Sequence, residues 1–259
     1  VERDPHGGTN TFTISGTTNL PVSQSTNLLY PENAFGNRGY VFPEGSGQPG
    51  STSIWNSLGL AEENNRVVKE TPYNGQGVVW ECINQDTDTH PYDGGATTDW
   101  IDIEASSTYR FSIWARKQYD DPARGLLQFM AQGQGVPTGY GIELFFTQTP
   151  PSMGTDLDDW YLYVAYLDGS GSATIGDHPD KGIWSRDGVQ EVATAGGGIL
   201  PSGAISTRIV FGQVYNFSPP TEGGETIDFF GPRIDLDDGS APSIDNLIDT
   251  ANTVNLGAN

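Results

Sequence analysis

Short runs of alternating apolar and polar residues follow one another along most of this chain, from about residue 27 onward. Clusters of Gly, Pro, Asn and Asp separate them, as is typical of turns between strands. Successive side chains of a β-strand point to opposite faces, so alternation with a period of two predicts strands. The best runs are Val67–Glu70, Gly77–Ile83, Tyr109–Lys117, Leu126–Gln132, Tyr140–Thr147, Tyr161–Leu167, Thr207–Phe217 and Thr226–Leu236. About eight strands predict an all-β chain that folds as a jelly-roll β-sandwich.

Helical spacing occurs once, near the C-terminus. The apolar residues that recur there at steps of three and four are Ile244, Leu247, Ile248, Ala251 and Val254. Ser243 precedes them as a candidate N-cap. This pattern predicts one short C-terminal helix, which either docks on the sandwich or contacts a neighbouring subunit.

The ends of the chain differ from its middle. The first 25 residues are polar and rich in Thr and Ser. We therefore predict an N-terminal arm or linking strand over 1–25, one β-sandwich over 26–241, and a C-terminal helix and tail over 242–259. A single domain is the better expectation because sandwiches of this length commonly form one.

The chain carries 33 acidic and 12 basic residues, a formal net charge of −21. Such a field repels phosphate backbones and anionic lipid surfaces, so we expect neither a nucleic-acid partner nor membrane insertion. Cys82 is the one cysteine, which excludes an intrachain disulfide and a cysteine-based zinc site. The 28 aromatic residues (6 Trp, 11 Tyr and 11 Phe) favour a packed core.

Two segments place tryptophan beside polar residues. In the run from Tyr109 to Arg116, alternation puts Trp114 on one face with Arg110 and Arg116, a combination that can stack a sugar ring and donate hydrogen bonds to its hydroxyls. The alternative is a covered ring that forms cation–π pairs with the arginines. The long Gly-rich segment 168–188 contains Trp184 and Asp187 and is either a binding loop or a structural one.

Acidic clusters occur at 84–93 and at 235–239. Carboxylates at alternate positions of a Gly-bearing loop can supply the oxygen ligands that Ca²⁺ takes. We therefore predict Asp235, Asp237 and Asp238 as ligands of a structural calcium ion. Solvated turns are the alternative, because neither cluster matches the twelve-residue calcium loop.

No catalytic motif is present: the three histidines lack metalloprotease spacing, and no nucleophile elbow, phosphate-binding loop or dinucleotide fingerprint occurs. We therefore predict no catalytic residue. A pair of carboxylates for glycoside hydrolysis, with Glu81 and Glu143 as the candidates within strands, stays open because their separation depends on folding.

Four segments together resemble jelly-roll, carbohydrate-binding-like modules of bacteriophage tail-fibre and other virion proteins and of bacterial surface proteins. They are YRFSIWARK, WYLYVAYLDGSGS, KGIWSRDG and FFGPRIDLDDG, in this order along the chain. The resemblance implies a sandwich that binds glycans, often with a metal-braced edge. It gives weight to Trp114, Trp160, Tyr163, Trp184, Arg233 and Asp235.

These observations lead to a non-catalytic, lectin-like module on a virion or another extracellular surface. Its predicted partner is a polysaccharide or cell-surface glycan, bound by Trp114, Arg116, Trp160, Tyr163, Trp184 and Asp187. One alternative is a purely structural virion decoration or fibre subunit that forms homo-oligomers or contacts other virion proteins. A second alternative is a polysaccharide lyase or glycoside hydrolase.

Overall fold

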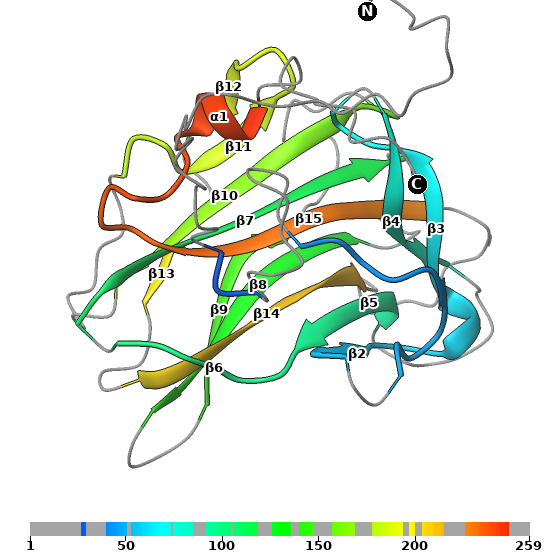
Figure 1. Ribbon diagram of the computed structural model, residues 1–259, viewed down its shortest axis with the longest axis horizontal. Helices are drawn as coiled ribbons and strands as arrows, with labels where there is room; N and C mark the ends of the chain where they lie inside the picture. The colour runs from blue at the N-terminus through cyan, green and yellow to red at the C-terminus, as the bar shows by residue number, and fades with distance from the viewer. Residues whose placement is uncertain are drawn as a thin grey trace, which may run out of the picture.

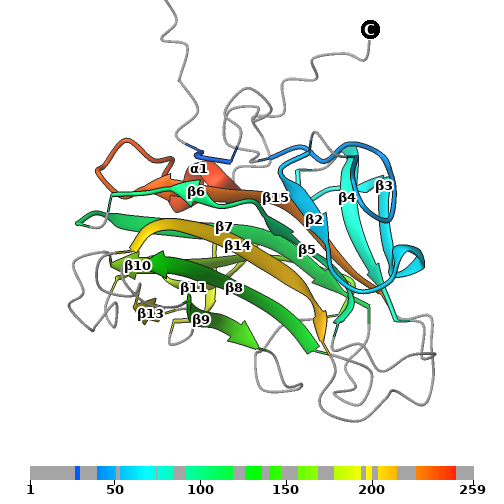
Figure 2. The same cartoon turned by 90° about the horizontal axis from the view of Figure 1, so that it is seen from below.

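The computed structural model describes residues 27–29, 40–50, 53–73, 75–84, 92–104, 106–118, 126–135, 140–147, 157–168, 178–193, 197–199, 204–214 and 226–248. In this part of the chain two β-sheets lie against each other as layers (Figure 1, Figure 2). The predicted class, an all-β jelly-roll sandwich with a short C-terminal helix, is confirmed.

The larger sheet has nine strands, which we call the nine-stranded sheet. Its order is β1 (Gly45–Ser46), β3 (Asn64–Glu70), β4 (Gln76–Ile83), β15 (Thr226–Leu236), β7 (Thr108–Lys117), β10 (Trp160–Asp168), β11 (Gly182–Ser185) and β12 (Gln190–Val192). β13 (Gly197–Ile199) pairs with β10 in parallel, whereas the other pairs are antiparallel.

The smaller sheet has six strands. Its order is β2 (Trp55–Ser57), β5 (Tyr92–Thr98), β14 (Ala204–Val214), β8 (Leu126–Gly135) and β9 (Tyr140–Thr147), and β6 (Ile101–Asp102) pairs with β14. A 3-10 turn, η3 (Ala61–Glu63), leads into β3, and α1 (Ile244–Ile248) follows β15. Figure 2 views the molecule from the side of the six-stranded sheet.

All eight predicted strands occur, with bounds that differ by three residues or fewer where the ends are described. The short strands were missed because they have few alternating positions. β5 was missed for another reason, since it contains two adjacent glycines. At Gly95 the backbone has φ +136°, and an added Cβ would collide with the carbonyl of Phe211 in β14. The glycine thus allows two strands to approach closely, at a position where the pattern indicates a turn.

Aromatic rings fill the space between the two sheets. Phe211 of β14 lies 4.7 Å from Phe229 of β15 and 5.8 Å from Trp80 of β4, measured between ring centroids. Phe42 and Trp55 extend the cluster, and all five rings are buried. Alternation predicts correctly which side of β7 faces this core: Tyr109, Phe111, Ile113 and Ala115.

The other face of the nine-stranded sheet is also covered. Trp114 of β7 donates a hydrogen bond from Nε1 to the Tyr73 hydroxyl (3.2 Å), and that hydroxyl donates to the Leu247 carbonyl in α1 (2.8 Å). Within α1, Ile244, Leu247 and Ile248 are buried. The predicted cap is confirmed, because Ser243 Oγ accepts a hydrogen bond from the amide of Asn246 (3.2 Å). The helix therefore docks on its own sheet, on the side away from the six-stranded sheet (Figure 1).

Candidate functional site

The three rings predicted on β7 and β10 are buried. Trp114 has the predicted strand face, together with Arg110 and Arg116, but only 1 % of it is exposed. Trp160 is equally buried and lies beneath the Arg116 guanidinium, 4.8 Å from the ring centroid. Tyr163 is on the interior side, opposite Ile113 and Ile183. The expectation of an open stacking surface here is corrected, because Tyr73 and α1 cover the sheet and the rings serve packing.

Arg116 belongs to a row of charges that crosses this sheet. Its Nε and Nη2 donate to Asp228 Oδ2 at 3.2 and 2.7 Å, and Lys69 Nζ approaches the other oxygen of Asp228 at 2.9 Å. Lys69 also pairs with Glu81. Burial alone would lower the pKa of Lys69, but its contacts with Glu81 and Asp228 outweigh this and raise it. Arg116 thus uses its guanidinium N–H groups to bind Asp228 within the protein.

The same row bears on the predicted carboxylate pair. Glu81 has Asp228 as its neighbour across Lys69, and Asp228 is fully buried. Lys69 therefore holds Glu81 in an ion pair. The side chain of Glu143, in β9, lies outside the described residues.

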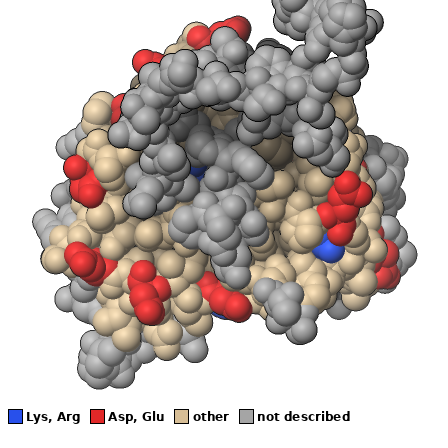
Figure 3. Space-filling view, viewed as in Figure 1, with Lys and Arg blue, Asp and Glu red and all other residues tan. Residues whose placement is uncertain are grey.

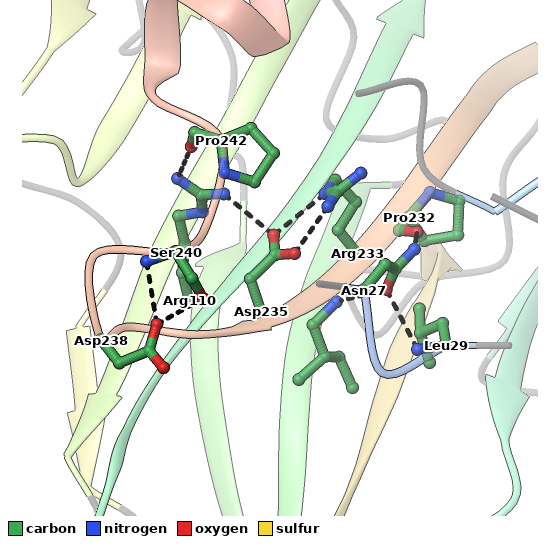
Figure 4. A network of polar contacts seen from close by, with 10 residues as sticks. Asn27, Leu29, Arg110, Pro232, Arg233, Asp235, Asp238, Ser240 and Pro242 are labelled. Carbon is green, nitrogen blue, oxygen red and sulfur yellow. Dashed lines mark hydrogen bonds and ion pairs between the residues drawn. The ribbon is translucent and has the colours of Figure 1, made fainter. Parts of the chain in front are cut away.

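The three aspartates predicted as calcium ligands do not form a common site. Asp235 accepts hydrogen bonds from Arg233 Nε and Nη2 (2.9 and 2.6 Å) and from Arg110 Nη2 (2.9 Å), as Figure 4 shows. Asp238 accepts from Ser240, and Asp237 lies 3.5 Å from His178 Nε2. Among the described residues no group of three His, Cys, Asp or Glu side chains could hold a metal ion. At Asp235 the guanidinium groups of Arg110 and Arg233 supply the positive charge.

Calcium binding itself stays a prediction, and most of the acidic cluster at 84–93 lies outside the described residues. An ion bound by the folded state alone stabilises that state. We therefore expect the melting temperature to fall when a chelator removes calcium and to recover when calcium is added back. An unchanged transition, with magnesium as the control ion, would contradict this prediction.

Trp184 and Asp187 are the predicted binding residues that remain accessible. The segment 168–188, predicted as a loop, contains the strand β11, which lies between β10 and the edge strand β12. Trp184 is partly exposed in β11, and its Nε1 donates to the Asp180 carbonyl (2.9 Å). Asp187 is exposed in the turn between β11 and β12. The two stay predicted as ligand-binding residues.

A second surface lies on the outer face of the six-stranded sheet and was not predicted from the sequence. We call it the amide face and define it by the partly exposed side chains Tyr92, Trp100, Gln128, Gln132, Gln134 and Arg208. Strand pairing brings them together: Arg208 of β14 lies opposite Gln132 of β8, and Gln128 opposite Gly212. Between them, the buried side chains Thr97, Met130 and Val210 form a floor, since they occupy one row across β5, β8 and β14.

Arg208 and Trp100 form the centre of the amide face. The guanidinium carbon of Arg208 lies over the Trp100 ring, 4.6 Å from its centroid, and Arg208 Nε donates to Gln132 Oε1 at 2.6 Å. A cation held on an aromatic face and fixed by an amide keeps both the ring and the guanidinium in one orientation. Gln134 Oε1 accepts a weaker hydrogen bond from Ser206 Oγ (3.3 Å).

Tyr92 occupies the other end of this surface, over a glycine. A Cβ at Gly212 would lie 3.4 Å from the Tyr92 ring and 2.6 Å from the Gly94 carbonyl, so the missing side chain makes room for the phenol. Burial raises the pKa of Tyr92 above its ordinary value of 10.0, and the positive charge of Arg208 only partly opposes this. The hydroxyl therefore stays protonated at neutral pH and can donate a hydrogen bond.

The side chains of the amide face fit the chemistry of sugar recognition. An aromatic ring offers an apolar face to the C–H groups of a pyranose, and the amide, phenol and guanidinium groups can bond its hydroxyls. Of the chain's six tryptophans, only Trp100 and Trp184 are partly exposed. One sequence signal pointed to Trp100: it lies between Asp99 and Asp102 at the ends of short polar strands, where a core tryptophan is not expected.

Comparisons with known proteins give distant structural similarities only. No protein-family model and no curated protein matches the chain. The CBM22-1 xylan-binding domain of Paenibacillus barcinonensis Xyn10C is similar over 80 % of this chain and 98 % of that domain, with 10 % identity and a TM-score of 0.38. The N-terminal cellulose-binding domain of Cellulomonas fimi β-1,4-glucanase C is similar over 76 % of this chain and 97 % of that one (13 % identity, TM-score 0.36).

An exo-β-agarase is similar over 80 % of this chain and 26 % of its own, with 11 % identity and a TM-score of 0.41. Similarities at this level assign no ligand to the present chain.

No helix among the described residues is long and apolar enough to cross a membrane.

Proposed function

We propose that this chain is a non-catalytic glycan-binding module and that a polysaccharide binds on the amide face. The observation that carries the proposal is the partly exposed Trp100 ring, held by Arg208 within a surface of glutamine side chains. Gln132 and Gln134 use their Oε1 atoms in hydrogen bonds within the protein, and no described residue accepts from their amide N–H groups, which can donate to a ligand. Gln128 Oε1 is buried and has no hydrogen-bond partner among the described residues.

The test compares two tryptophans that are both partly exposed but lie on different sheets. Trp100→Ala is expected to weaken binding to a responsive polysaccharide about tenfold or more, as measured by affinity electrophoresis or calorimetry, since about 1.4 kcal/mol of lost stacking is a factor of ten. Trp184→Ala is the matched control. If Trp184→Ala alone abolishes binding, the site lies at Trp184 and Asp187. If the wild-type chain binds no polysaccharide in a broad panel, the proposed function is wrong.

The setting of the module, on a virion or another extracellular surface, belongs to the same proposal and rests on the sequence resemblance alone. The structural alternative, a fibre or decoration subunit, predicts assemblies that dissociate without residues 1–25 and show no glycan binding. Truncation at the other end should keep α1, because Leu247 holds Tyr73 and its loss would disturb the fold. Removal of 249–259 is therefore the appropriate C-terminal variant.

A further inference from the structure

Arg208 and Arg66 are the described arginines that have no ion pair, and of the two only Arg208 is partly exposed. Arg66 is buried and donates hydrogen bonds to the carbonyls of Pro43 and Gly47. Ion pairs occupy five of the described cations: Lys69, Arg110, Arg116, Arg186 and Arg233. Arg208 uses Nε for Gln132 and lies over Trp100, but no carboxylate of a described residue is within ion-pair distance of it. Its two terminal nitrogens are therefore available on a partly exposed surface.

This arrangement is unexpected in a chain with 33 acidic and 12 basic residues. Acidic side chains are spread over the face of the molecule seen in Figure 3, where few basic ones are visible. Two aspartates are near the end of the amide face: Asp99 accepts a hydrogen bond from Asn56 (3.0 Å), and exposed Asp102 lies opposite Ser206 in the β6–β14 pair. Neither neutralises Arg208.

Resting on the proposed function, we infer that the glycan bound on the amide face is anionic and that Arg208 binds its carboxylate or sulfate group. The terminal N–H groups of a guanidinium form a planar fork that matches two oxygens of such an anion. Gln132 and Trp100 fix that fork before the ligand arrives, which lowers the entropic cost of binding.

The net charge of −21 does not prevent this contact. Charges separated by more than about 8 Å are largely screened at physiological ionic strength, so the local guanidinium dominates for an anion in contact with it. The acidic surface outside this contact repels a polyanion at low salt, which lowers its affinity there. We therefore expect the affinity for an anionic glycan to pass through a maximum as salt is raised, whereas a neutral glycan shows little dependence.

The experiment measures dissociation constants of the full chain for three kinds of polysaccharide: neutral xylan, uronate-bearing polygalacturonate and alginate, and sulfated carrageenan. The wild-type chain is expected to bind one anionic class at least tenfold more tightly than xylan. Arg208→Gln should reduce that preference about tenfold, and Arg208→Lys should restore part of it. Arg186→Gln, on the other sheet, is the matched control and should leave the preference unchanged. A preference for uronate or for sulfate identifies the anionic group.

The outcomes separate this inference from the proposed function. If xylan binds as tightly as the anionic glycans and Trp100→Ala abolishes that binding, the inference of an anionic ligand is wrong. The amide face then remains the proposed binding site. An anionic preference that survives Arg208→Gln would overturn the role of Arg208. Absence of binding to every polysaccharide would overturn both. Thermal unfolding of each variant checks that it is folded.

Discussion

Replacing Asp235 by Asn is expected to lower the free energy of unfolding by about 3–5 kcal/mol. The carboxylate is fully buried and bonds two guanidinium groups, those of Arg110 and Arg233, which are nearly as buried. Asn keeps the shape of the side chain but removes its charge, so two buried cations lose the carboxylate that they share. The same network joins β7 to the segment before α1, because Arg110 donates a hydrogen bond to the Pro242 carbonyl (2.5 Å).

Urea denaturation with linear extrapolation measures this loss. Asp187→Asn is the control, since Asp187 is exposed in a turn and its substitution should leave the midpoint unchanged. Equal midpoints for the Asp235 variant and the wild type would contradict the expectation. They would mean that the buried ion cluster contributes no net stability relative to its amide analogue.

The effect of Asp235 should depend on pH in one direction. Burial alone would raise the pKa of Asp235, but the hydrogen bonds and charges of Arg233 and Arg110 outweigh it and lower the pKa below its ordinary value of 3.8. A carboxyl group whose pKa is lower in the folded state stabilises that state fully at a pH above its unfolded-state pKa. It loses this contribution as the pH falls through its folded-state pKa. The stability difference between wild type and Asp235→Asn should therefore shrink as pH falls below 3.8.

The second large effect is expected at the centre of the core. Phe211→Ala should lower the free energy of unfolding by about 3–5 kcal/mol, because it removes a buried ring and leaves a cavity between the sheets. The ring contacts Phe42, Trp55, Trp80 and Phe229 at centroid distances of 4.7 to 5.9 Å. Neighbouring aromatic rings are too large and too constrained to fill the space that it vacates.

Ile205→Ala is the control for this substitution. Ile205 belongs to the same strand, β14, but is 53 % exposed, and changes at such positions usually stay within about 0.5 kcal/mol. Denaturant midpoints and thermal unfolding report both variants. A loss below about 1 kcal/mol for Phe211→Ala would contradict the assignment of this cluster as the core.

The local periodicity of apolar residues predicted many elements of the fold. The period of two placed the long strands, and it assigned Trp114 to the side of β7 that bears Arg110 and Arg116. The spacing of apolar residues placed α1 and its Ser243 cap. These predictions succeed because strand faces and helix caps depend on residues only a few positions apart.

The candidate site depended on contacts between distant parts of the chain. Sequence alone determined that this is an all-β sandwich and that Trp114 shares a strand face with two arginines. It did not determine which tryptophans solvent reaches, because that depends on what packs over each sheet. Tyr73 and α1 cover Trp114, whereas Trp100 stays partly exposed beside an arginine more than 100 residues away in the chain. Burial is a property of the assembled layers, and therefore only the tertiary structure moved the candidate site from the nine-stranded sheet to the amide face.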